Sequence, residues 1–121
     1  MVHLIHCRRI YMPPTADDGM RILVERLWPR GIRKADAAID LWLKVIAPSR
    51  QLRQWYRHDP MRWTTFQEHY RDELDANSEP VSNLLHLIEA RDVTLVYAAR
   101  DVPGNSAKVL QDYLYKLIQM K

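Results

Sequence analysis

Arg26, Trp28 and Arg30 lie within seven residues of one another in the segment 25–31, which ends in Pro-Arg-Gly. An arginine guanidinium is planar, so it can bind a carboxylate or phosphate through two hydrogen bonds and can also stack on an aromatic ring. Residues of these types at this spacing predict a site for an anionic small molecule. The alternative is that Trp28 belongs to the core and that the proline and glycine only form a turn.

An acid and an amide, Asp101 and Asn105, occupy a second turn-forming segment, 100–105. This segment follows an apolar run, as the segment 25–31 does. Ligands of α/β proteins bind beyond the carboxyl ends of the strands, where such segments meet. We therefore expect the two segments to share one rim of the sheet, with Asn105 at the start of a helix.

Three further polar candidates are Ser49, Arg53 and His58. Ser49 can cap a helix in which Arg53 lies one turn later, so the hydroxyl, the helix amides and the guanidinium could bind one anion. Plain capping by Ser49 with a solvated Arg53 is the alternative. If the ligand is turned over, His58 or Asp101 would be the general acid or base and the arginines would stabilise negative charge; the sequence leaves turnover open.

Metal and cofactor signatures are absent from the sequence. Its five histidines have no metal-ligand spacing, and three glycines are too few for a phosphate-binding glycine loop, so we predict neither a metal nor a cofactor. Cys7 is the single cysteine, which excludes an internal disulfide and a cysteine-based zinc site.

The apolar runs at 22–24 and 93–99 predict strands that are covered on both faces, and the mixed segment 3–11 predicts a first strand. Apolar residues at helical spacing predict the remaining elements. These are helices over 35–46, from the Ser49 cap to about 57, from Asp59-Pro60 to near 77, from Pro80 onward, and after the turn at 101–105.

This order of elements predicts an α/β fold, with a small three-stranded, mostly parallel sheet packed with about five helices. A chain of 121 residues without linkers or repeats should form one domain, 1–121. The segment 12–20 is shorter than a normal parallel crossover, so the direction of the first strand stays open.

The net charge of +3 is unevenly distributed along the chain. Residues 1–60 hold 11 basic and 6 acidic residues, and residues 61–121 hold 7 and 9. The basic N-terminal half supports a rival interpretation, a nucleic-acid or protein interaction module. No apolar run is long enough to span a membrane, and we expect a cytoplasmic protein whose oligomeric state the sequence does not give.

Several motifs together resemble a bacterial family, the YeaO-like short branch of the domain of unknown function numbered 488. They are Asp18-Gly19, the run 21–31 that ends in Leu-Trp-Pro-Arg-Gly, Ala47-Pro48-Ser49, Leu52-Arg53, Trp55, His58 and 97–101. The resemblance spans nearly the whole chain and implies no known activity. At positions 105–107 this chain has Asn-Ser-Ala, where longer relatives carry Cys-His-Arg and short members often carry Asn-His-Ala. Ser106 therefore departs from both groups, and it provides neither a nucleophilic cysteine nor a catalytic histidine.

Overall fold

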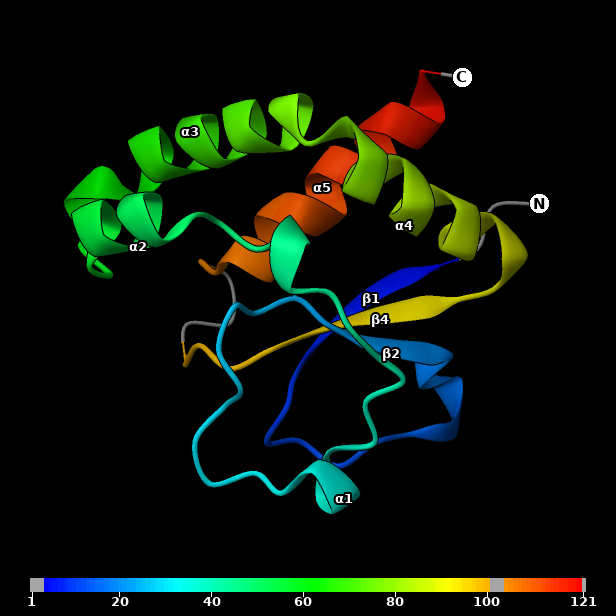
Figure 1. The fold of residues 1–121 in the computed structure, drawn as a ribbon. Helices are drawn as coiled ribbons and strands as arrows, with labels where there is room; N and C mark the ends of the chain where they lie inside the picture. Colours follow the sequence, from blue (N-terminus) through cyan, green and yellow to red (C-terminus); the bar gives the residue numbers. More distant parts are fainter. Residues whose placement is uncertain (1–3, 101–103, 121) are drawn as a thin grey trace.

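The computed structural model describes residues 4–100 and 104–120. Its centre is a parallel sheet (Figure 1). In spatial order its four strands are β1 (Ile5–Arg9), β4 (Val93–Tyr97), β2 (Met20–Leu23) and β3 (Leu41–Trp42). The α/β class and the parallel sheet are confirmed, whereas the prediction of three strands was wrong.

The additional strand, β3, lies inside the segment 35–46 that was predicted to be one helix. The helix α1 ends after one turn, at Lys34–Ala37, because Ala38 adopts a left-handed conformation with φ of +52°. Asp40 then pairs with Arg21 through two hydrogen bonds. The backbone N–H of Arg21 donates to Asp40 Oδ2 at 2.8 Å, and the backbone N–H of Asp40 donates to the Arg21 carbonyl at 2.8 Å. This pairing aligns the next two residues with β2, so local contacts override the helical spacing.

The first strand is parallel to its neighbour, which answers the question of its direction. Residues 10–19 join β1 to β2 without an α-helix, and β4 lies between the two strands. A 3-10 turn, η1 (Ala16–Asp18), leads into Gly19, whose φ is +64°. A Cβ on Gly19 would lie 2.2 Å from the carbonyl oxygen of Asp92, so glycine is required there.

The remaining elements, apart from a 3-10 turn inside the segment 35–46, are mostly where the sequence predicted them. They are η2 (Lys44–Ile46), α2 (Arg50–Tyr56), η3 (Pro60–Arg62), α3 (Trp63–Ala76), α4 (Ser78–Ala90) and α5 (Ser106–Gln119). The predicted caps are confirmed, since the side chains of Ser49, Asp59 and Asn105 each accept a backbone N–H at the start of a helix or 3-10 turn. The helix α4 begins two residues before Pro80, which was predicted to open it.

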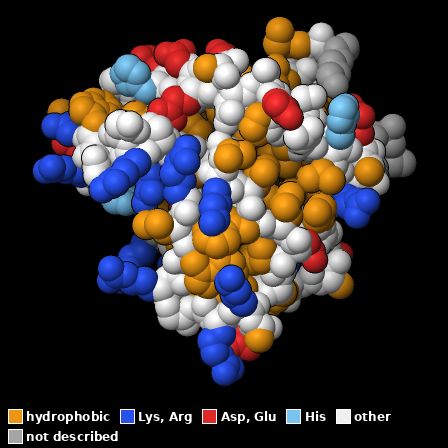
Figure 2. Space-filling model, viewed as in Figure 1, with side chains coloured by type: hydrophobic (Ala, Val, Ile, Leu, Met, Phe, Trp, Pro, Cys, Tyr) orange, Lys and Arg blue, Asp and Glu red, His pale blue; other side chains and the backbone are white. Residues whose placement is uncertain are grey.

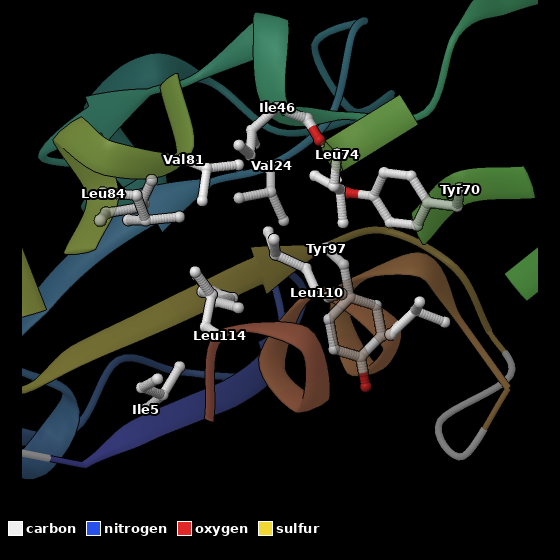
Figure 3. Close-up of a cluster of buried hydrophobic side chains, with 14 of the residues drawn as sticks. Ile5, Val24, Ile46, Tyr70, Leu74, Val81, Leu84, Tyr97, Leu110 and Leu114 are labelled. Atoms are coloured by element: carbon white, nitrogen blue, oxygen red, sulfur yellow. Dashed lines mark hydrogen bonds between the residues drawn. The ribbon is translucent and has the colours of Figure 1, made fainter. Parts of the chain in front are cut away.

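Both faces of the sheet are covered, as the uninterrupted apolar runs predicted. On one face, α3, α4 and α5 pack over Ile22, Val24 and Leu95 (Figure 1). Figure 3 shows Val24 among the side chains of Leu74, Leu84 and Leu110 from these three helices. On the other face, Leu23 and Val96 pack with α1 and with partly buried tryptophans. No helix within 4–100 and 104–120 is long and apolar enough to cross a bilayer.

Candidate functional site

A cleft opens where β2 and β4 end, at the edge of the sheet where the sequence analysis expected a ligand. Its polar part has a volume of about 320 Å³. Glu25, just after β2, and Ser106, the first residue of α5, line it on one side. Arg53 of α2 and His58 line it from the other. Figure 2 shows Lys and Arg side chains gathered on the left of the molecule, where Figure 1 places α2.

Glu25 is a half-buried carboxyl in this part of the cleft. Its Oε1 accepts the backbone N–H of Ala98 at 3.0 Å, which ties the end of β2 to the end of β4. Burial raises the pKa of Glu25, and the hydrogen bond from Ala98 and the charges of Arg53 and His58 oppose that shift only in part. The cleft therefore combines two basic side chains with a carboxyl that resists ionisation.

The backbone around His58 is unusual. Arg57 and His58 both have left-handed conformations, with φ of +49° and +57°, which non-glycine residues adopt rarely. The backbone N–H of Asp59 donates to the carbonyl of Tyr56 at 3.0 Å and closes this turn. The imidazole lies 5.7 Å from the Tyr56 ring, between centroids, and borders the cleft.

The cleft continues past His58 into a wider part of about 560 Å³. Tyr56, His58, Ala98, Ala99 and Gly104 line both parts, so the two form one continuous depression. The wider part adds three residues of a different character, Pro60, Trp63 and Arg100.

Arg26 and Ser49, two predicted ligand-binding residues, line a separate open groove. The Arg26 guanidinium donates to the carbonyl oxygens of Pro48 at 2.8 Å and Ala47 at 3.2 Å. The Ser49 hydroxyl donates to Glu73 Oε2 at 2.5 Å and its backbone N–H to Glu73 Oε1 at 2.8 Å. Both side chains thus hold the segment before α2 in place.

Trp28 packs on the opposite face of the sheet from the large helices, and Arg30 follows it in the same loop. Trp28 donates its indole N–H to the carbonyl of Ile32 at 2.6 Å and packs edge-on against Trp42, with 5.4 Å between ring centroids. The Arg30 side chain is exposed, while its carbonyl accepts the Tyr11 hydroxyl at 2.9 Å.

Asn105 is 4% exposed and serves as the cap of α5, with its Oδ1 accepting the N–H of Lys108 at 3.1 Å. The second predicted catalytic residue, Asp101, lies outside the described residues. Of the eight predicted site residues, the structure therefore brings Arg53 and His58 to one cleft.

Sequence reasoning missed Glu25, Tyr56 and Ser106 as residues that line the cleft. A signal existed for Glu25, because it is the first charged residue after the buried run 22–24. The arginines that follow it were chosen instead. Tyr56 gives no such signal, since an aromatic residue at helical spacing usually belongs to the core.

Within residues 4–100 and 104–120, no three His, Cys, Asp or Glu side chains are grouped so that they could hold a metal ion.

The sequence pattern of a protein family described as "Inactive DUF488-N3 subclade" matches residues 4–121. The chain belongs to this DUF488-N3i family. The resemblance that the motifs predicted is thereby confirmed for almost the full length of the chain.

Relatives of this DUF488-N3i protein carry names that state no activity. Uncharacterized protein YeaO of Escherichia coli is 42% identical over 113 residues, which are 93% of this chain and 98% of YeaO. Uncharacterized protein Rv3073c of Mycobacterium tuberculosis is 41% identical over 110 residues, which are 91% of this chain and 92% of that protein. No solved structure matches the chain.

Proposed function

We propose that this protein binds a small molecule with a phosphate or carboxylate group in the polar part of the cleft, and that it does so without turning the molecule over. The observation that carries the proposal is the position of Arg53, His58 and Ser106 around one cavity at the carboxyl ends of β2 and β4. This is the edge at which α/β proteins bind ligands.

Each of these side chains has a defined part in binding. Arg53 supplies a guanidinium that can pair with two anionic oxygens at once, and the Ser106 hydroxyl supplies a neutral donor. The His58 imidazole adds a ring N–H donor beside them. Glu25 accepts hydrogen bonds, so it suits hydroxyl groups on the remainder of the ligand rather than its anionic end.

Two observations support binding without turnover. The family description calls the subclade inactive. In addition, residue 106 of this chain is a serine, and a serine hydroxyl is a weak nucleophile unless a base lies within hydrogen-bond distance. A cytoplasmic location is part of this proposal, since a single cysteine suits a compartment in which disulfides are rare.

An exposed tryptophan favours a second candidate function, binding of single-stranded nucleic acid. Trp55 is 39% exposed, and the guanidinium carbon of Arg62 lies 5.2 Å from its ring centroid. Bases stack on exposed aromatic rings, and arginines attract the phosphates. Loss of oligonucleotide binding in Trp55→Ala, with inorganic phosphate binding unchanged, would favour this function over the cleft.

Titration calorimetry with inorganic phosphate tests the main proposal. Arg53→Gln should weaken binding about 10- to 100-fold, the range for losing a hydrogen bond to a charged group. Arg53→Lys keeps the charge but loses the planar fork, so it should also weaken binding while leaving the free energy of unfolding within about 0.5 kcal/mol of wild type. Arg50→Gln is the matched control, because Arg50 is an exposed arginine of the same helix.

Equal phosphate affinity in wild type and Arg53→Gln would remove Arg53 from the site. A large loss of stability in Arg53→Lys would instead make its guanidinium a structural group. Absence of any phosphate or carboxylate binding by the wild-type protein would overturn the proposal as a whole.

A further inference from the structure

The wider part of the cleft has one aromatic wall. Tyr56 and Phe66 stack with ring centroids 4.4 Å apart, and Trp63 stacks on Phe66 at 5.6 Å with an angle of 16° between the ring planes. Trp63 also lies 5.8 Å from Tyr56. Since Phe66 is buried and contacts both other rings, it holds this wall in place before any ligand arrives.

Three of the other described residues that line this part are small. Ala98 and Ala99 follow β4, and Gly104 lies two residues before α5. Their side chains are a methyl group or a hydrogen atom, so they take up less of this space than larger side chains would. The aromatic wall together with these small residues makes a slot that suits a planar ring.

The slot opens directly into the polar part of the cleft, because Tyr56, His58 and Ala98 line both. A ligand that fills the two parts therefore needs a planar ring at one end and an anionic group at the other, with polar groups between them near Glu25. The two parts have volumes of about 560 and 320 Å³, each within the range of pockets for small molecules.

We propose that the ligand of this cleft is a nucleoside monophosphate, with its base in the slot between Trp63 and Ala99 and its phosphate at Arg53 and Ser106. A nucleoside monophosphate joins a planar base to a phosphate through a sugar whose hydroxyl groups are donors for Glu25. This inference rests on the proposed function, to which it adds the class of ligand. Stacking of a base on an aromatic side chain contributes about 1–3 kcal/mol.

Titration calorimetry with AMP, GMP, CMP, UMP and ribose 5-phosphate tests the class of ligand. The tightest of the four nucleotides should bind at least about fivefold more tightly than ribose 5-phosphate, since 1 kcal/mol of stacking corresponds to that ratio. Trp63→Leu should reduce this advantage and leave the affinity for ribose 5-phosphate unchanged. Arg53→Gln should weaken the binding of nucleotides and ribose 5-phosphate alike.

Two further variants make the result specific. Tyr11→Leu is the control, because Tyr11 is an exposed aromatic residue outside the cleft that contacts Arg9 and Arg30. Ala99→Leu adds a large side chain to a small residue that lines the slot and leaves the aromatic rings intact, so it should abolish the nucleotide advantage even if Trp63→Leu fails to fold. Circular dichroism establishes which variants are folded.

If ribose 5-phosphate binds as tightly as every nucleotide, the inference is overturned while the proposed function stands. The same holds if folded Trp63→Leu and Ala99→Leu both retain the full nucleotide advantage. If none of these phosphate esters and no inorganic phosphate or carboxylate binds, the proposed function itself fails and the inference fails with it.

Discussion

Glu25 shows how one half-buried carboxyl can affect both the cleft and the stability of the fold. Its Oε1 is held by the Ala98 N–H, yet burial raises its pKa above the ordinary value of 4.5. The folded protein therefore binds this proton more tightly than the unfolded chain does. The stability that this provides is present below the unfolded pKa and is lost as the pH rises through the folded pKa.

Glu25→Gln should accordingly raise the melting temperature at pH 7. The glutamine carbonyl can still accept the Ala98 N–H, so the substitution removes the charge and keeps the hydrogen bond. Below about pH 4, where the carboxyl is protonated in both states, the advantage of the variant should disappear. Thermal unfolding of the two proteins from pH 4 to pH 8 measures this; a variant no more stable at pH 7 would mean that the attraction of Arg53 and His58 outweighs burial.

The sequence alone could predict single residues of the site only where the local pattern also sets the direction of the side chain. Arg53 and His58 line the cleft because the Ser49 and Asp59 caps, both readable from the sequence, fix the helix and the turn that carry them. Arg26 could not be assigned in this way. Its guanidinium bonds carbonyl groups 21 and 22 residues later, and such partners depend on the tertiary structure.

At the scale of elements, α3 has the buried face that its apolar spacing predicted. Phe66, Tyr70 and Leu74 are each at most 3% exposed, and Trp63 at the start of the helix is half-buried. The Tyr70 hydroxyl donates to the carbonyl of Ile46 at 2.7 Å, which joins α3 to η2 (Figure 3). The helix therefore packs on the core and also forms one wall of the cleft.

Phe66→Ala should cost about 3–5 kcal/mol of unfolding free energy, because it removes a buried ring and leaves a cavity beneath Tyr56 and Trp63. Thr65→Ala, at the exposed neighbouring position, is the control and should stay within about 0.5 kcal/mol of wild type. Urea denaturation of the three proteins gives both values. An unchanged midpoint for Phe66→Ala would show that this face of α3 is not packed.

The segment 35–46 shows where prediction of elements from the sequence fails. Its apolar residues have helical spacing, but the left-handed Ala38 ends α1 and the pairing of Asp40 with Arg21 starts β3. Arg21 is itself 4% exposed and is bonded to the buried Asp18 at 2.7 Å and to the carbonyl of Ala38 at 3.0 Å. A buried arginine that organises its surroundings leaves no periodic signal along the chain.

For the whole molecule, contacts between the two ends of the chain complete the fold. The Tyr115 hydroxyl accepts the N–H of Ile5 at 2.8 Å, and the Gln111 side chain donates to the Ile5 carbonyl at 2.6 Å. These bonds fasten α5 along the outer edge of β1. Cys7 lies on the same strand, with its thiol donating to the carbonyl of Ala107 at 3.5 Å, so it reports on whether this contact between β1 and α5 is closed.

The native protein should therefore react slowly with a thiol reagent such as dithionitrobenzoate. Burial raises the pKa of Cys7 from 9.0 to about 11, with the charge of Lys108 opposing the shift. At pH 8 this lowers the fraction of reactive thiolate about 100-fold relative to the unfolded chain, and the rate should fall at least that far because access is also restricted. The native rate should rise about tenfold per pH unit between pH 7 and pH 10, as long as the protein stays folded. Stopped-flow absorbance with and without denaturant measures both rates, and a native rate close to the denatured one would mean that β1 separates from α5 in the folded protein.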